Sequence, residues 1–171
     1  MILLQNDEFR LRPWHSGDEA TLVVHANNYK IWLNLRDTFP HPYTWQDAQT
    51  WVAYANTFPN TLNLAIDIDG EACGGAGLFF QQDIHRRSAE IGYWLGEAYW
   101  NRGIATAAVK MLSDFAFRHY DLCRLYAGIM EYNPASMRVL EKAGYVLEAV
   151  HRQALTKNGR TLDEYLYTLL A

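Results

Sequence analysis

The stretch Tyr99-Trp100-Asn101-Arg102-Gly103-Ile104-Ala105-Thr106 places a glycine-bearing turn between a segment typical of a strand and one typical of a helix. The segment before it, Ser88 to Leu95, is short and rich in Ile, Tyr and Trp, as strands are. After the turn, apolar residues recur at helical spacing: Ile104, Ala105, Ala108, Val109, Leu112, Phe115 and Ala116. A helix therefore begins near Gly103. Its first N–H groups lack intrahelical partners, so they stabilise an anion such as a pyrophosphate.

The spacing of this turn resembles the motif Gln/Arg-x-x-Gly-x-Gly/Ala, with which the GNAT family of N-acetyltransferases binds the pyrophosphate of acetyl-coenzyme A (acetyl-CoA). Here the motif reads Trp100-x-x-Gly103-x-Ala105, so Trp100 departs from the first position of the general pattern. The longer pattern Tyr-Trp-x-x-Gly-x-Ala-Thr resembles the RimJ/RimL-like branch of that family, which contains ribosomal-protein N-terminal acetyltransferases. A glycine turn between a strand and a helix is also a common tight connection, and this motif alone does not separate the two interpretations.

A second motif lies downstream, where an apolar strand-like segment, Leu122 to Met130, is followed by Asn133-Pro134-Ala135-Ser136 at the start of a helix. Asn is a favoured helix N-cap and Pro fits the first helical position, so local structure explains part of this pattern. The full pattern Asn-x-x-Ser-x-x-x-Leu-Glu-Lys-x-Gly-Tyr, from Asn133 to Tyr145, also resembles the RimJ/RimL-like branch where coenzyme A is bound. Two ordered matches on suitable elements favour the family.

Length and composition predict one domain over residues 1–171, because the chain shows no linker, repeat or low-complexity segment. The net charge of −4 argues against a nucleic-acid partner. No apolar run approaches a membrane span and the start lacks a basic signal-peptide flank, so we expect a soluble cytoplasmic protein without a membrane partner. The six histidines show no paired ligand spacing and the two cysteines lie far apart, which predicts no metal.

The order of predicted elements indicates an α+β fold. A short strand at Phe9 to Arg12 precedes one or two helices and then a helix capped near Thr44. Three strands, the Gly103 helix, the Leu122 strand, the Pro134 helix and a C-terminal hairpin follow, and Asp69-Gly70 and Asn158-Gly159 predict tight hairpin turns. The glycine-rich run Cys73 to Gly77 lacks the Lys-Ser/Thr of a phosphate loop and predicts a bulge or close backbone contact.

The resemblance implies a GNAT fold with a central mixed twisted sheet, helices on both faces, and two strands that splay apart to hold the pantetheine arm. It assigns the splayed pair to Glu90 through Leu95 and Leu125 through Met130, with a backbone N–H near Trp94 or Leu95 binding the thioester oxygen. The coenzyme-binding residues that the resemblance implies are Tyr93, Trp94, Leu95, Asn101, Arg102, Gly103, Ile104, Ala105, Thr106, Asn133 and Ser136.

Acetyl transfer requires an ammonium group to lose a proton and a thiolate to gain a hydrogen bond or a proton. Glu90 is the candidate general base, because partial desolvation beside Ile91 and Trp94 would bring its protonation equilibrium towards working pH. An ordinary half-exposed strand carboxylate is the other interpretation of Glu90. The early loop Phe39-Pro40-His41-Pro42-Tyr43 cannot continue a helix, and the resemblance places it beside the acceptor site.

Ser136 is the candidate general acid by resemblance, and a polar residue that satisfies the helix end is the alternative. Tyr126 and Tyr132 are alternative hydroxyl donors. Tyr126 also occupies a strand position where the related branch often carries Glu, which leaves the assignment of the base open.

Together these features predict an acetyl-CoA-dependent N-acetyltransferase that transfers the acetyl group to a primary amine by direct attack in a ternary complex. The acceptor is a protein N-terminal amine, a polyamine or another small amine, and the sequence does not choose among them. A catalytically idle acyl-CoA-binding regulator on the same fold is the alternative function. The oligomeric state, including a homodimer, is left open.

Overall fold

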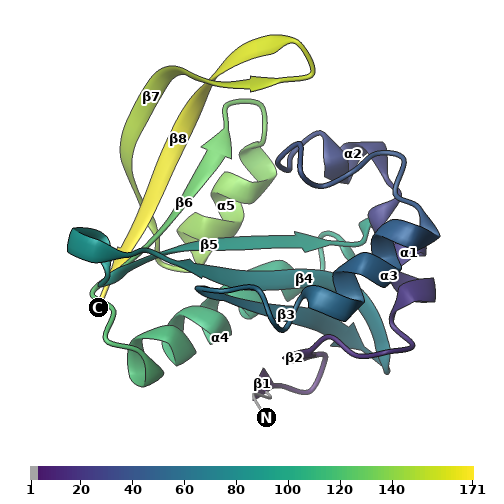
Figure 1. The fold of residues 1–171 in the computed structure, drawn as a ribbon. Coiled ribbons are helices and arrows are strands. Elements are labelled where there is room, and N and C mark those ends of the chain that lie inside the picture. The colour runs from purple at the N-terminus through teal and green to yellow at the C-terminus, as the bar shows by residue number, and fades with distance from the viewer. Residues whose placement is uncertain (1–3) are drawn as a thin grey trace.

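The computed structural model describes residues 4–171 and contains an eight-stranded sheet with helices on both faces (Figure 1). In their order across the sheet, the strands are β1 (Leu4–Gln5), β2 (Arg10–Pro13), β3 (Thr61–Ile68), β4 (Glu71–Phe80), β5 (Ser88–Leu95), β6 (Arg124–Met130), β8 (Arg160–Leu170) and β7 (Val146–Lys157). Neighbouring strands are antiparallel except β5 and β6, which are parallel. The sheet is therefore mixed, as predicted.

Helices cover the two faces of this sheet. They are α1 (Glu19–Ala26), α2 (Tyr29–Trp32), α3 (Trp45–Tyr54), α4 (Ile104–His119) and α5 (Pro134–Lys142), with short 3-10 helices η1 (Asp83–His85) and η2 (Glu97–Tyr99). Successive residues of β3 point to opposite faces, so Leu64 and Ile66 join the large core under α4 and α5. Ala65 joins a second core beneath α1 and α3.

Two hairpin turns and the start of α3 form where the local sequence predicts them. Asp69 and Gly70 have φ values of 53° and 91°, and Asn158 and Gly159 have 50° and 73°. Two consecutive positive φ angles match the twist of the flanking strands, so both hairpins form where expected. At the start of α3, the Thr44 side chain accepts from the backbone N–H of Asp47, and the Asp47 carboxylate accepts from that of Thr44.

The glycine-rich run of β4 contains the predicted bulge. Ile66 of β3 lies opposite Gly74 and Asp67 lies opposite Ala72, which leaves Cys73 as an extra residue on β4. Gly74 is also a close backbone contact, because a Cβ there would lie 2.5 Å from the carbonyl oxygen of Trp94. The run is therefore a structural part of the sheet.

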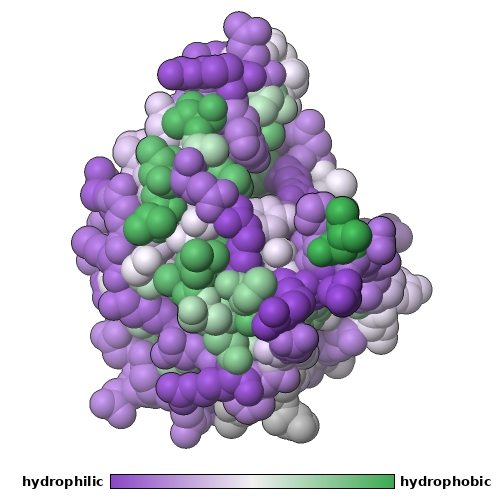
Figure 2. Space-filling view, turned by 90° about the vertical axis from the view of Figure 1, so that its left-hand side faces the viewer, coloured by the Kyte–Doolittle hydropathy of each residue, from purple (hydrophilic) through white to green (hydrophobic). Residues whose placement is uncertain are grey.

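The sheet ends at β7, whose outer edge has no neighbouring strand among residues 4–171. Figure 2, seen from the side of the molecule that carries β7, shows hydrophobic patches separated by hydrophilic side chains. The exposed large hydrophobic residues include Val146 and Leu147 of β7 and Leu170 of β8. In the described part of the chain, no helix combines the length and the apolar character that crossing a membrane requires.

Candidate functional site

The two central strands separate after a short paired segment. β5 and β6 pair only at Ser88–Arg124, Ala89–Leu125 and Glu90–Tyr126, and beyond these pairs they diverge (Figure 1). The splayed pair predicted from the sequence is therefore present. Its start differs from the expectation, because Glu90 is still paired with Tyr126 and the gap opens only after them.

The direction of the backbone groups of β5 follows from strand alternation. The N–H of Gln81 donates to the carbonyl of Ser88, and the N–H of Gly96 donates to Cys73, so even-numbered residues of this segment direct their backbone groups towards β4. Odd-numbered residues direct theirs towards β6, which places the N–H groups of Tyr93 and Leu95 in the gap. Alternation thus favours Leu95 over Trp94 as the donor to a ligand in the gap.

The Trp100 side chain forms a hydrogen bond with a backbone carbonyl group that faces the gap. Its indole Nε1 donates to the carbonyl oxygen of Leu95 at 2.7 Å. Because a buried carbonyl without a partner is costly, this bond gives Trp100 a structural role at the end of the gap. The position where the general motif has Gln or Arg therefore carries a side chain that completes the wall of the site.

The turn before α4 has the geometry of an anion-binding loop. Asn101 has φ 61°, and Gly103, the N-cap of α4, has φ 81° and no side-chain cap bond. The N–H groups of Ile104, Ala105 and Thr106 precede the first residue that can bond within the helix, so they are available to a ligand. Arg102 is exposed, with its guanidinium 5.5 Å from the centroid of the Tyr99 ring. The predicted loop residues thus lie together at one end of the gap.

A pair of hydroxyl groups bridges β5 and the start of α5. The Tyr93 Oη and the Ser136 Oγ lie 2.6 Å apart. The Asn133 side chain accepts from the backbone N–H of Ser136 at 3.2 Å, so Asn133 supplies the helix cap. Burial raises the pKa of Tyr93 well above its usual value, and its phenol therefore stays protonated. Sequence patterns named both residues, and the fold brings their hydroxyl groups into contact.

The two alternative hydroxyl donors have different surroundings. Tyr132 donates to the carbonyl oxygen of Leu33 at 2.6 Å, which links it to residues 33–37, the segment after α2. Tyr126 lies beside Glu90 across the last β5–β6 pair. The pKa of Tyr126 is raised, first by burial and then by the negative charge of Glu90, so its phenol also stays protonated.

Glu90 forms an ion pair that sequence reasoning missed. The Arg36 Nη2 lies 2.6 Å from each oxygen of the Glu90 carboxylate, and the guanidinium is 5.7 Å from the centroid of the Phe79 ring. The carboxylate that the sequence suggests as a base therefore has a positively charged partner, which the expectation based on Ile91 and Trp94 did not include. No local signal links Arg36 to Glu90, since they lie on separate elements.

Glu90 and Tyr93 point to opposite sides of the sheet. Tyr93 packs against the large core under α4 and α5, whereas Glu90 contacts the segment after α2. A carboxylate and a pair of hydroxyl groups thus approach the gap from its two faces. Such an arrangement can accept a proton on one side and donate one on the other.

The segment after α2 is held by the tip of the β7–β8 hairpin. The Lys157 Nζ lies 2.8 Å from the Asp37 Oδ1 and 3.9 Å from the centroid of the Trp32 ring, and only 2% of its side chain is exposed. A buried lysine is rare without a partner, and here an anion and an aromatic face provide one. Lys157 therefore fixes the segment that carries Arg36.

Most of the chain matches a known protein family. Residues 8–146 match the acetyltransferase (GNAT) domain family. The chain is 42% identical over 84 residues to "Probable N-acetyltransferase YjcK" of Bacillus subtilis, covering 49% of this chain and 46% of that protein. It is 28% identical over 157 residues to spermidine N(1)-acetyltransferase of Escherichia coli, covering 88% and 80%. The chain spans 46 to 62% of the length of three curated Bacillus relatives that it matches.

Solved structures share the fold. A structure of RimL, a ribosomal L7/L12 alpha-N-protein acetyltransferase in complex with coenzyme A, superposes with a TM-score of 0.86 at 21% identity, covering 99% of this chain and 98% of that chain. An acetyltransferase (GNAT family) from Bacillus anthracis superposes with a TM-score of 0.84 at 20% identity, covering 99% and 98%. The α+β fold predicted from the sequence is confirmed.

Proposed function

The chain belongs to the GNAT acetyltransferase family, and we propose that it transfers the acetyl group of acetyl-CoA to a primary amine by direct attack in a ternary complex. The observation that carries this proposal is the gap between β5 and β6. It opens after Glu90 and Tyr126, with the α4 turn at one end and the Tyr93–Ser136 hydroxyl pair beside it.

We assign coenzyme binding to the walls of this gap. The pyrophosphate accepts from the N–H groups of Ile104, Ala105 and Thr106, where the helix dipole is positive. The amides of the pantetheine arm pair with the backbone groups that Tyr93 and Leu95 direct into the gap, because unpaired groups there are otherwise costly. One of these N–H groups also stabilises the negative charge that develops on the thioester oxygen.

The chemistry divides between the two faces of the gap. On one face, Glu90 accepts a proton from the acceptor ammonium, directly or through a water molecule. The neutral amine attacks the carbonyl carbon, the C–N bond forms, the C–S bond breaks, and the newly bonded nitrogen releases one proton to solvent to give the neutral amide. On the other face, the Ser136 hydroxyl donates a hydrogen bond or a proton to the departing thiolate. Tyr93 in turn donates to the Ser136 Oγ.

The acceptor belongs to the amines, and two relatives support different members of that class. Spermidine N(1)-acetyltransferase and RimL are named for a polyamine and for a protein N-terminal amine. We propose that the acceptor enters beside Arg36, whose guanidinium already occupies a cation position against the Glu90 carboxylate. An incoming ammonium would compete with Arg36 for these oxygens.

A screen of acetyl-CoA consumption tests the proposed function. The amines are peptides with free N-termini, spermidine and other polyamines, and aminoglycosides. Turnover with any of them that releases one coenzyme A per acetylated amine supports an N-acetyltransferase. Tight acetyl-CoA binding without turnover on the whole panel would instead support the idle regulator.

Gly103→Ala is expected to weaken acetyl-CoA binding by about tenfold or more. The added methyl group meets no protein atom within 4 Å, so it would occupy the open space where the pyrophosphate approaches the backbone. The measurement is calorimetric titration of acetyl-CoA into the folded variant. A valine here would add the strain of a β-branched side chain at φ 81°, which makes alanine the cleaner substitution.

Gly159→Ala is the matched control for this prediction. Gly159 also has a positive φ, 73°, and open space around its Cβ position, but it lies in the β7–β8 turn. Both variants should lose a similar amount of stability through backbone strain, about 1 kcal/mol. Equal acetyl-CoA affinities in the two variants would contradict the proposed anion site.

Lys157→Met is expected to raise the KM for the amine by about threefold to thirtyfold while leaving the Kd for acetyl-CoA unchanged. The reason is that Lys157 fixes Asp37 and Trp32, and thereby the segment that carries Arg36. Steady-state kinetics with varied amine and a separate acetyl-CoA titration check this. Lys110→Met, an exposed lysine on α4, is the control and should change neither value.

A further inference from the structure

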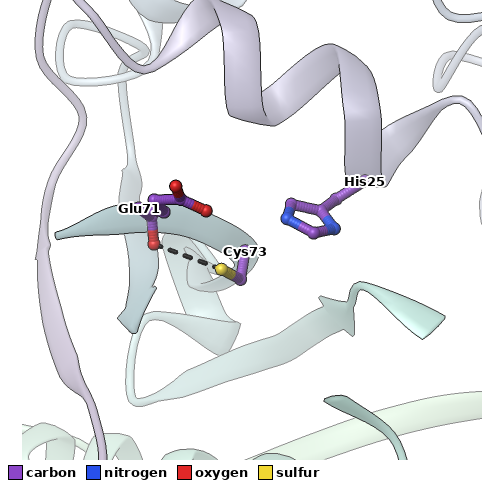
Figure 3. Close-up of side chains that lie close together, drawn as sticks. All are labelled: His25, Glu71 and Cys73. Atoms are coloured by element: carbon purple, nitrogen blue, oxygen red, sulfur yellow. Dashed lines mark hydrogen bonds between the residues drawn. The ribbon is translucent and has the colours of Figure 1, made fainter. Parts of the chain in front are cut away.

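Three potential metal ligands meet at one end of β4, next to the end of α1 (Figure 3). They are His25 of α1 and Glu71 and Cys73 of β4, and their ligand atoms all lie within 4.8 Å of one another. In Figure 3 the His25 imidazole extends from its helix towards the side chain of Cys73. Cys73 is buried, His25 is partly buried and Glu71 is exposed, so the cluster is open to solvent on one side.

The backbone brings these side chains together. Cys73 is the extra residue of the β4 bulge, and a bulge changes the direction of a side chain relative to a regular strand. Gly96 leaves room for the imidazole, because a Cβ there would lie 2.6 Å from the His25 Nδ1. The N–H of Gly96 in turn donates to the Cys73 carbonyl at 2.8 Å, which fixes the end of β5 against the bulge.

We propose that His25, Glu71 and Cys73 bind a zinc ion, with water as the fourth ligand. Imidazole nitrogen, thiolate sulfur and carboxylate oxygen are all zinc ligands. Bond lengths of about 2.0 to 2.3 Å in tetrahedral geometry separate the ligand atoms by about 3.5 Å. The ligand atoms lie within 4.8 Å of one another, so ion binding would require a contraction of at most about 1.3 Å, and the exposed side chain of Glu71 can move most readily.

The charges of the cluster suit a divalent ion. A thiolate and a carboxylate balance the two positive charges of zinc, and a neutral imidazole adds none. The Cys73 thiol donates to the backbone carbonyl oxygen of Glu71 at 3.3 Å, and zinc binding would release the thiol proton to solvent as the Zn–S bond forms (Figure 3).

The site lies beside the segment that leads into the α4 turn. The His25 ring meets the ring of Tyr99 in η2 edge-on, with centroids 5.5 Å apart. A bound zinc would therefore tie α1 to β4 next to η2 and stabilise the fold there. The spacing argument that predicted no metal missed this cluster, because α1 and β4 are distant in the sequence and meet only in the fold.

The test uses Co²⁺ as a spectroscopic probe of the full chain, reduced and freed of metal by a chelator. One equivalent of Co²⁺ should give thiolate-to-cobalt charge-transfer absorption, and Zn²⁺ should displace it. Cys73→Ser should abolish this absorption, whereas Cys123→Ser should retain it, since Cys123 is the exposed cysteine outside the cluster. Zinc should also raise the Tm of the wild type and of Cys123→Ser but not of Cys73→Ser.

His25→Ala and Glu71→Gln provide a test that does not depend on the buried cysteine. Each should weaken Co²⁺ binding by at least about tenfold, the scale seen even for residues that only support metal ligands. His85→Ala, an exposed histidine in η1, is the control and should bind as the wild type does. Absence of the charge-transfer absorption in folded wild-type protein, or its persistence in folded Cys73→Ser, would overturn the proposal.

Discussion

Replacing Ser136 with alanine is expected to lower kcat by about ten- to a thousand-fold while leaving acetyl-CoA affinity nearly unchanged. The hydroxyl group would no longer assist the departing thiolate, whereas the backbone of α5 and the coenzyme contacts would remain. Steady-state kinetics and a calorimetric acetyl-CoA titration on the same variant separate the two quantities. A fall in affinity with unchanged turnover would be the reverse of this expectation.

The structure distinguishes this role from a helix-end role. Asn133 already caps α5 through the backbone N–H of Ser136, and the Ser136 hydroxyl is directed to Tyr93 instead. Asn133→Ala should therefore lower the stability by about 1 kcal/mol and change turnover less than Ser136→Ala does. An unchanged kcat in Ser136→Ala, together with a lower Tm, would return Ser136 to a structural role and leave Tyr126 or Tyr132 as the next hydroxyl donor.

Tyr93→Phe extends the test to the hydroxyl pair. If Tyr93 acts by donating to the Ser136 oxygen, its removal should cost turnover only while Ser136 is present. The double variant Ser136→Ala, Tyr93→Phe should then be no slower than Ser136→Ala alone, as is expected of residues that act as a unit. Additive losses would indicate that Tyr93 acts independently of Ser136.

Glu90→Gln is expected to lower kcat/KM on the order of a hundredfold and to remove the acidic limb of the pH–rate profile. The ionised carboxylate is the active form, so wild-type kcat/KM should fall as the pH is lowered and the carboxylate takes up a proton. The measurement is a pH series of kcat/KM on both proteins with the same amine. An unchanged limb in Glu90→Gln would show that the amine itself, or another base, sets the profile.

The sequence by itself determined the elements whose signals are local. Asp69-Gly70 and Asn158-Gly159 specify tight hairpin turns because Asn, Asp and Gly tolerate the positive φ angles that such turns require. Thr44 and Asp47 start α3 through bonds between residues three apart. The turn at Gly103 and the Asn133 cap likewise depend on neighbouring residues, so both helix starts could be predicted without a structure.

Only the tertiary structure decided which distant groups meet. Tyr93 contacts Ser136 because β5 and α5 both pack against α4, and Arg36 pairs with Glu90 because the β7–β8 hairpin fixes the segment after α2. Strand alternation directs the backbone N–H of Leu95, rather than that of Trp94, into the gap. This alternation depends on how β5 pairs with β4. These contacts arise from packing and strand register between segments far apart in the chain, and no local pattern of residues encodes them.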